Sequence, residues 1–319
     1  MEPRALNDAV ANDLDRRVAE AATYGVDQVC STTRWIEPAA AAFTPQALPR
    51  VFEGDCGFAA FLEHENPRGA VFTSFDCIWG FACPLLGPDP AALVEEVGRK
   101  LIPQLDFYAL SISGVEPEGP LFDALTRLNL VGHTGAVDRC VADLADGFEA
   151  WLARRSSRFR RSLRTAVRTA ESAGVELETE APSTVAETDA TLNRILAIEA
   201  TSWKTDAESG LIDTDLGRFT ADMAHRFAVA GDLRVQFATL NGHDIGYVIG
   251  GRVGTRYRGF QHSFDHRYSD LSIGKFLQFR NIEALAHEGI DTYDLGMFMD
   301  YKQSYSDRLE STITLIIAG

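Results

Sequence analysis

Apolar residues change their spacing several times along the chain, and each change marks a different kind of element. Over residues 6–22 they recur every three or four positions, which predicts an amphipathic helix. Residues 57–63 and 70–79, joined by the polar, Pro- and Gly-containing HENPRG, predict a β-hairpin. The rest of the first half is expected to form a helix from Pro90, the strand FYALSISGV, a short helix near 121–128 and a strand near 131–142.

The second half begins with helical spacing over residues 147–172, expected as one continuous helix that Gly174 ends. Three alternating stretches predict consecutive strands, and Asn241-Gly242 between the first two is a strong hairpin signal. These strands are LRVQFATL, IGYVIGGRV and TRYRGFQHSF. The other expected elements are the strand VELETE, helices near 186–201, 214–230 and 272–288, the strand TYDLGM, the short helix MDYKQSYS and the strand STITLIIAG.

The order of elements is similar in the two halves from the hairpin onward. The first half gives β-β-α-β-α-β and the second, after its helices, β-β-β-α-β-α-β, which indicates divergent copies of one fold. At 319 residues and 45% hydrophobic, the chain can bury two cores. We therefore expect an α+β fold with two tandem domains, 1–145 and 146–319, each a mostly antiparallel mixed sheet flanked by helices.

Charge and cysteine content narrow the classes of function. The formal net charge of -16 disfavours general nucleic-acid binding, so no DNA partner is expected. One segment differs, because residues 154–168 hold seven arginines and no acid, which suits a small polyanion. The five cysteines show no CxxC spacing, so no metal site is expected. Without a signal peptide or membrane-spanning run, the sequence favours a cytoplasmic protein with no membrane insertion.

Several ordered segments carry a resemblance to a known family. They are FRRSLRTAVRTAESAGVE, IEATSWK, LRVQFATLNGHDIGYVIG, FDHRYSDLSIGKFLQFRNIEALAHEGIDTYDLG and YKQSY. Together they resemble the CelD-like branch of the GNAT superfamily, related to FemABX-type peptidyltransferases, over residues 151–317. The first half resembles, more weakly, the degenerate GNAT-like domain of such proteins through TRWIEPAAAAFTP and LFDALTRLNL. The resemblance implies an acyltransferase with acyl-CoA, acetyl-CoA or longer, as co-substrate and no metal.

The resemblance also implies a donor site at the loop over residues 266–275. There the pyrophosphate of CoA would meet backbone N–H groups at the start of a helix, an arrangement that favours anions. Ser272 and Gly274 fit this role, and Arg267 and Lys275 would add positive charge. The chain has Ser272-Ile273-Gly274 where relatives often carry Ser-Pro-Gly. An ordinary helix start with surface cations is the alternative.

Five residues are candidates for the chemistry. Asp294 ends an apolar strand, where a buried carboxylate needs a partner, and Lys302 resembles a lysine that relatives place in the cleft, where it can bind an anion or an oxyanion. Tyr301 and Tyr305 lie one helical turn apart, and either could protonate the departing thiolate. His262 is the histidine best placed to act as a general base. Packing or solvation is the alternative for each.

Four further residues are candidates for substrate binding. Glu199 and Trp203 are spaced i and i+4 on one helix and could present a carboxylate and an aromatic wall to the acceptor, although core packing is the stronger single explanation for Trp203. Arg161 and Arg164, with Arg168, form a stripe of positive charge at helical spacing. That stripe is either a site for an anion or a solvated face.

Three functions remain open at this stage. The first is an acyl-CoA-dependent N-acyltransferase, in which a small-molecule or peptide amine attacks the thioester directly, with an acyl carrier protein as another source of the acyl group. The second is FemX-like transfer of an aminoacyl group from tRNA, for which a broad basic surface would be expected. The third is a catalytically silent GNAT-like binding protein. The acceptor, the acyl length and the oligomeric state stay open.

Overall fold

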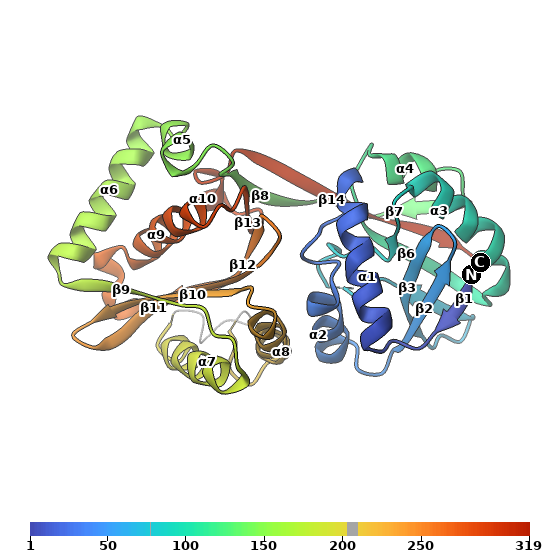
Figure 1. Ribbon diagram of the computed structural model, residues 1–319, viewed down its shortest axis with the longest axis horizontal. Coiled ribbons are helices and arrows are strands. Elements are labelled where there is room, and N and C mark those ends of the chain that lie inside the picture. The colour runs from blue at the N-terminus through green and yellow to red at the C-terminus, as the bar shows by residue number, and fades with distance from the viewer. Residues whose placement is uncertain (77, 203–209) are drawn as a thin grey trace. The chain divides into compact units, whose positions relative to one another are not determined.

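The computed structural model describes residues 1–76, 78–202 and 210–319, and the chain forms two compact units (Figure 1). The N-terminal unit consists of Met1–Asp138 and Glu310–Gly319, and the C-terminal unit of Arg139–Leu309. Compactness alone does not show where independent domains begin and end. The domain limits expected from the sequence, 1–145 and 146–319, therefore stay a prediction.

The N-terminal unit packs short helices against a sheet. Its strands are β1 (Glu2–Arg4), β2 (Leu48–Gly54), β3 (Gly57–His64), β4 (Ala70–Thr73), β5 (Leu85–Leu86), β6 (Phe107–Val115), β7 (Leu130–His133) and most of β14 (Arg308–Ala318). Its helices are α1 (Asp8–Ala21), η1 (Ala22–Tyr24), α2 (Thr33–Phe43), α3 (Pro90–Glu96), η2 (Val97–Leu101), η3 (Ile102–Gln104) and α4 (Pro120–Leu125). The predicted hairpin is confirmed, because β3 and β4 pair antiparallel.

The C-terminal unit is richer in helix. Its strands are β8 (Val137–Asp143), β9 (Val175–Glu180), β10 (Leu233–Leu240), β11 (His243–Val253), β12 (Arg256–Phe264) and β13 (Thr292–Met297). Its helices are α5 (Phe148–Ala153), α6 (Ser157–Ser172), α7 (Val185–Glu199), α8 (Asp215–Val229), η5 (His266–Leu271), α9 (Ile273–His287) and α10 (Asp300–Gln303). No described helix of either unit is long and apolar enough to cross a membrane.

The two sheets share one topology. In the N-terminal unit the strands lie in the order β1-β2-β3-β4-β6-β14, and in the C-terminal unit in the order β9-β10-β11-β12-β13-β8. Each sheet contains one parallel pair, β4 with β6 and β12 with β13, among antiparallel neighbours. The fold is therefore mixed α+β with mostly antiparallel sheets, as the sequence predicts, and the units are two copies of one architecture.

The N-terminal sheet is completed by a strand from the far end of the chain. β14 follows the C-terminal unit in sequence but pairs with β6 and β7. β8, at the start of the C-terminal unit, pairs with β13. The two strands hold equivalent positions, next to the second strand of the parallel pair.

Helices cover both faces of the C-terminal sheet, with α6 and α9 on one side and α7 and α8 on the other (Figure 1). The core between α9 and the sheet includes Trp151, Leu163, Phe276 and Tyr257. The single helix expected over residues 147–172 is wrong, because the chain forms α5 and α6 instead. The cause is Ser156, whose hydroxyl accepts a hydrogen bond from the Phe159 N–H at 3.2 Å and starts a new helix.

Candidate functional site

The main cavity of the C-terminal unit opens where two parallel strands separate. β12 and β13 pair only along Arg256–Arg258 and Thr292–Asp294, and β12 then continues to Phe264. A cavity of about 830 Å³ lies beyond the last pair. Backbone groups freed by the separation of two strands can bind an extended ligand that carries amides. A volume of this size also suits a small-molecule substrate.

The cavity brings together seven of the residues predicted for the site. They are His262, Ser272, Gly274, Lys275, Tyr301, Lys302 and Tyr305. Apolar side chains supply much of the remaining wall: Phe159, Leu216, Val248, Phe260, Phe264 and Leu295. Among the described residues, the other predicted candidates are not part of the wall: Arg161, Arg164, Glu199, Arg267 and Asp294.

The N-terminus of α9 forms one side of the cavity. Ser272 adopts a left-handed conformation with φ 56°, and its side chain makes no capping bond to the described residues of α9. The first N–H groups of any helix have no partner inside the helix and carry partial positive charge. Lys275 adds a full charge there, positioned by a 3.0 Å hydrogen bond from its Nζ to the Ser162 Oγ of α6.

Gly274 allows α9 to approach β12 closely. A Cβ at this position would lie 3.2 Å from Cε1 and 3.3 Å from Nε2 of His262. These separations are tighter than ordinary van der Waals contact, so a larger side chain would push into the cavity or displace His262. The same small residue therefore keeps open the space at the N-terminus of α9.

Arg267 is engaged by a neighbouring carboxylate. Its Nε lies 3.0 and 2.9 Å from the two oxygens of Asp265, which is itself 2% exposed. This contact raises the pKa of Arg267 and lowers the pKa of Asp265. The ion pair leaves Lys275 as the cation that reaches the cavity from this loop.

Three further candidates line the cavity: Tyr301 and Lys302 on the short helix α10, and Tyr305 just after it. Tyr305 is 4% exposed and packs edge-on against Phe159, with ring centroids 4.9 Å apart. Tyr301 is 53% exposed. Partial burial raises the pKa of Tyr301 and near-complete burial raises the pKa of Tyr305, so both hydroxyls are protonated at neutral pH. The Nζ of Lys302 donates to the Met297 carbonyl at 3.1 Å, which bends the lysine back over the end of β13.

Asp294 lies below the cavity, with none of its surface exposed. Its Oδ2 accepts hydrogen bonds from Arg139 at 2.7 Å and from Arg258 at 2.8 Å, and its Oδ1 from the Gly296 N–H at 2.8 Å. Both arginines are also buried. The sequence indicated that a carboxylate here needs a cationic partner, and the structure supplies two buried ones.

The candidates for substrate binding lie in different places. Glu199 is 1% exposed and accepts a 2.6 Å hydrogen bond from the Tyr247 hydroxyl. Burial, together with the Glu199 charge, raises the pKa of Tyr247 well above its usual value. Arg161 and Arg164 line a separate groove of about 500 Å³ along α6. Trp203 lies outside the described residues.

Six polar residues of the wall were not singled out from the sequence: Gln261, Ser263, Ser269, Gln278, Tyr293 and Ser304. The Ser263 Oγ and the Gln278 Nε2 are buried without a hydrogen-bond partner among the described residues. Buried polar groups of this kind are costly unless something else binds them. Alternation along β12 is the one sequence signal that places Ser263 on a buried face, and nothing in the sequence shows that α9 turns Gln278 towards the cavity.

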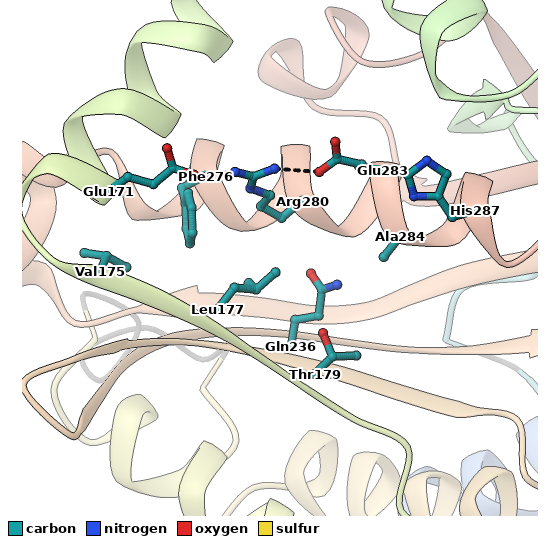
Figure 2. A pocket seen from close by; sticks show the side chains of 10 residues that line it. All are labelled: Glu171, Val175, Leu177, Thr179, Gln236, Phe276, Arg280, Glu283, Ala284 and His287. Carbon is teal, nitrogen blue, oxygen red and sulfur yellow. Dashed lines mark hydrogen bonds and ion pairs between the residues drawn. The ribbon is translucent and has the colours of Figure 1, made fainter.

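A smaller cavity, of about 380 Å³, lies between α9 and strands β9 and β10 (Figure 2). Its one arginine is engaged by two carboxylates. Arg280 bonds Glu283 at 2.7 Å, drawn as the dashed line in Figure 2, and also pairs with Glu171. The larger cavity has Lys275 and the N-terminus of α9 on its wall, so it is the better site for an anionic substrate. Among the described residues, no group of three or more His, Cys, Asp or Glu could hold a metal ion.

Comparison with known proteins agrees with this geometry. Residues 157–303 match the family model described as an acetyltransferase (GNAT) domain. No curated protein sequence matches the chain. Among solved structures, FemX is similar over 98% of this chain and 97% of its own, with 11% identity and a TM-score of 0.69. A conserved protein of unknown function from Bacteroides thetaiotaomicron is similar over 99% of both chains, with 10% identity and a TM-score of 0.66.

A third solved structure, the L-PGS of Bacillus licheniformis, is similar over 94% of this chain and 90% of its own, with 12% identity and a TM-score of 0.56. Identities this low show the fold alone. The C-terminal unit thus contains a GNAT domain, and the whole chain has the FemABX-like tandem GNAT fold.

Proposed function

We propose that the C-terminal unit is an N-acyltransferase that moves an acyl group from acyl-CoA to an amine. One observation carries the proposal: the cavity at the separation of β12 and β13 begins at the N-terminus of α9, beside Lys275. This arrangement can hold the two parts of the donor at once. The pyrophosphate would bind the N–H groups of α9 and Lys275, and the pantetheine arm would lie along β12.

The reaction needs few groups from the protein. The amine nitrogen attacks the thioester carbonyl, a C–N bond forms and the C–S bond breaks. The sulfur leaves as a thiolate that takes up a proton, while the amine loses one. The protein therefore has to position two substrates, stabilise the negative charge on the carbonyl oxygen, and supply and accept protons.

Tyr301 is the better of the two tyrosines to donate a hydrogen bond to the thiolate. A thiol has a pKa near ~8.5, so a phenol with a pKa above 10 stabilises the thiolate by hydrogen bonding more readily than by full proton transfer. Near-complete burial raises the pKa of Tyr305, and its ring is packed against Phe159. We assign Tyr305 to shaping the wall and Tyr301 to the leaving group.

Lys302 and His262 complete the proposed set. The Lys302 ammonium can stabilise the developing oxyanion or hold an anionic acceptor. His262, on β12 next to Gly274, can accept the proton that the amine loses. Asp294 would act through others, by fixing Arg139 and Arg258 beneath the strand ends. The acceptor would enter from the side of Leu216 on α8.

Calorimetric titration of the full chain with acetyl-CoA, octanoyl-CoA and free CoA tests the proposal. Saturable binding of at least one acyl-CoA to a single site is expected, followed by acylation of amines in a substrate panel read by mass spectrometry. If no acyl-CoA binds, the chain is not a CoA-dependent transferase. Binding without transfer to any amine would support the alternative of a catalytically silent GNAT-like binding protein.

The FemX-like alternative, transfer from aminoacyl-tRNA, is addressed in the same experiment. Likeness in fold to FemX does not fix the donor, and the net charge of -16 opposes a large RNA. Competition of tRNA with bound octanoyl-CoA would favour that alternative. A cytoplasmic location and an amine of small-molecule or peptide origin complete the proposal.

A further inference from the structure

The proposed reaction assigns no role to the arginine groove on α6. Four arginines line it together with Ser157, Val167 and Phe279: Arg160, Arg161, Arg164 and Arg168. In the described part of the chain, no carboxylate pairs with Arg161, Arg164 or Arg168, and all three are exposed. Elsewhere in the unit arginines pair with acids, as Arg194 does with Glu178, Glu180 and Asp244.

The charges on α6 do not stabilise the helix. No acid lies in its first turn, where the helix dipole favours one, and arginines stand there instead. Arg161 and Arg164 are spaced i, i+3, and Arg164 and Arg168 i, i+4, so like charges face each other on successive turns. Because the stripe destabilises its own helix, the stability of the fold does not explain it.

The stripe belongs to the helix that also lines the main cavity, although Phe159, the residue of α6 on the cavity wall, lies on another side of that helix. Ser162 of α6 accepts the hydrogen bond from Lys275, and Phe159 of α6 packs against Tyr305, which follows α10. On the α10 side, the approach to the cavity carries exposed apolar side chains, at Met297, Phe298 and Met299. Exposed apolar groups at the entrance of a cavity are typical of a docking site.

The length of the stripe sets the size of the partner. From Ser157 to Arg168 the helix rises about 16 Å at roughly 1.5 Å per residue. That is longer than one phosphate group and similar to three turns of a partner helix. A groove on a single helix fits an acidic helix, whereas a folded RNA would need basic surface over more of an acidic protein.

We propose that the stripe docks an acidic carrier protein, which presents its acyl-phosphopantetheine arm to the main cavity. The inference rests on the proposed function and names the source of the donor. The phosphate of the arm would lie at the N-terminus of α9, and acidic residues of the carrier helix would pair with Arg161, Arg164 and Arg168. Charge pairing at such a surface raises the rate of association and makes binding sensitive to salt.

Binding of two probes to the full chain tests the inference. The probes are octanoyl-loaded fatty-acid acyl carrier protein and octanoyl-CoA, each measured at low and at physiological ionic strength. The double variant Arg161→Glu/Arg164→Glu should weaken binding of the carrier at least tenfold and binding of octanoyl-CoA less than threefold. The matched control is Arg218→Glu/Arg226→Glu on α8, which changes the net charge equally and should leave both affinities within threefold.

A neutral variant separates docking from folding. Arg161→Gln/Arg164→Gln removes the like-charge repulsion, so its melting temperature should stay equal or rise while carrier binding falls. A lower melting temperature would show that the stripe stabilises the fold and would overturn the inference.

The other outcomes are equally distinct. Equal losses for the carrier and for octanoyl-CoA would assign the stripe to the phosphates of CoA, and tRNA binding that depends on the same arginines would assign it to RNA. Either result overturns the carrier. If octanoyl-CoA fails to bind the wild-type protein, the proposed function fails first, and the two failures are thereby distinguished.

Discussion

At the scale of single residues, the sequence predicts that Asp294 needs a cationic partner but does not identify that partner. The sequence indicates a carboxylate at the end of an apolar strand, and so a cationic partner. It does not reveal the partners, because Arg139 is 155 positions away and Arg258 is 36 positions away. Only the pairing of β13 with β8 and β12 brings these three side chains together.

The first prediction at this scale concerns that cluster. Asp294→Asn keeps the shape of the side chain but leaves two buried guanidinium groups without their counter-charge. The free energy of unfolding should fall by about 3–5 kcal/mol, the usual cost of breaking a buried ion pair from one side. Urea denaturation measures it, with Asp300→Asn on exposed α10 as the control. A change below about 1 kcal/mol would contradict the buried-cluster interpretation.

Substitution of Lys302 should reduce activity and leave stability unchanged, the reverse of the effect expected for Asp294→Asn. Its side chain is partly exposed, so Lys302→Met keeps the aliphatic bulk and should leave the melting temperature near that of the wild type. Turnover with the true substrate pair should fall about a hundredfold or more, as when one preorganised electrostatic group is lost. Full turnover in the variant would move the role to His262 and Tyr301.

At the scale of elements, the start of α9 is the feature that the function depends on most. Gly274→Leu would place side-chain atoms against His262 and into the cavity, since even a Cβ would lie 3.2 Å from Cε1. Crowding of this kind costs about 1–3 kcal/mol. Octanoyl-CoA should therefore bind about tenfold more weakly or worse, while the circular dichroism spectrum stays native. Gly254→Leu is not a suitable control, because its φ of 59° would add strain; Gly132, with open space around it, is suitable.

Most elements could be predicted from the sequence, and the site only in part. Apolar periodicity and the Asn241-Gly242 turn identify β10 and β11, because both signals are local. The break between α5 and α6 was missed, since Ser156 looks like any polar helical residue until its capping bond is seen. The separation of β12 and β13 cannot be read from the chain either, because it depends on where pairing between distant segments stops.

The same limit applies to Gln278 and Ser263. Each looks like an ordinary polar residue in its own segment, and only the cavity shows that its polar atom is buried without a partner among the described residues. The resemblance to a family supplied the candidates His262, Tyr301 and Lys302, which the structure gathers on one wall or another of the cavity. Their roles stay predictions.

At the scale of the whole molecule, the contribution of β14 to the N-terminal sheet gives a further prediction. Removal of residues 310–319 takes Ile313, Leu315 and Ile317, all at least nine-tenths buried, out of the N-terminal sheet. Each contributes about 1.5–3 kcal/mol, so the loss is comparable with the whole stability of a domain, about 5–15 kcal/mol. Hydrogen exchange should show lost protection in β3 and β6, while β10 and β11 keep theirs. Leu309→Ala, at an exposed position, is the control.

Uniform loss of protection through both units would contradict that prediction, and so would full protection of β6 in the shortened chain. The first result would mean that the units unfold together. The second would mean that β14 adds little to the N-terminal sheet.

The late position of β14 in the sequence also imposes an order on the folding of the nascent chain. Residues 1–138 leave the ribosome first, but β6 has to wait for β14 while residues 139–309 are made, on the order of ten seconds or more at ordinary rates of translation. During that time the nascent chain presents an open sheet edge, the kind of surface that chaperones cover and that aggregates form on. The C-terminal unit has all its strands by residue 309, so the half that is made first is the half that finishes folding last.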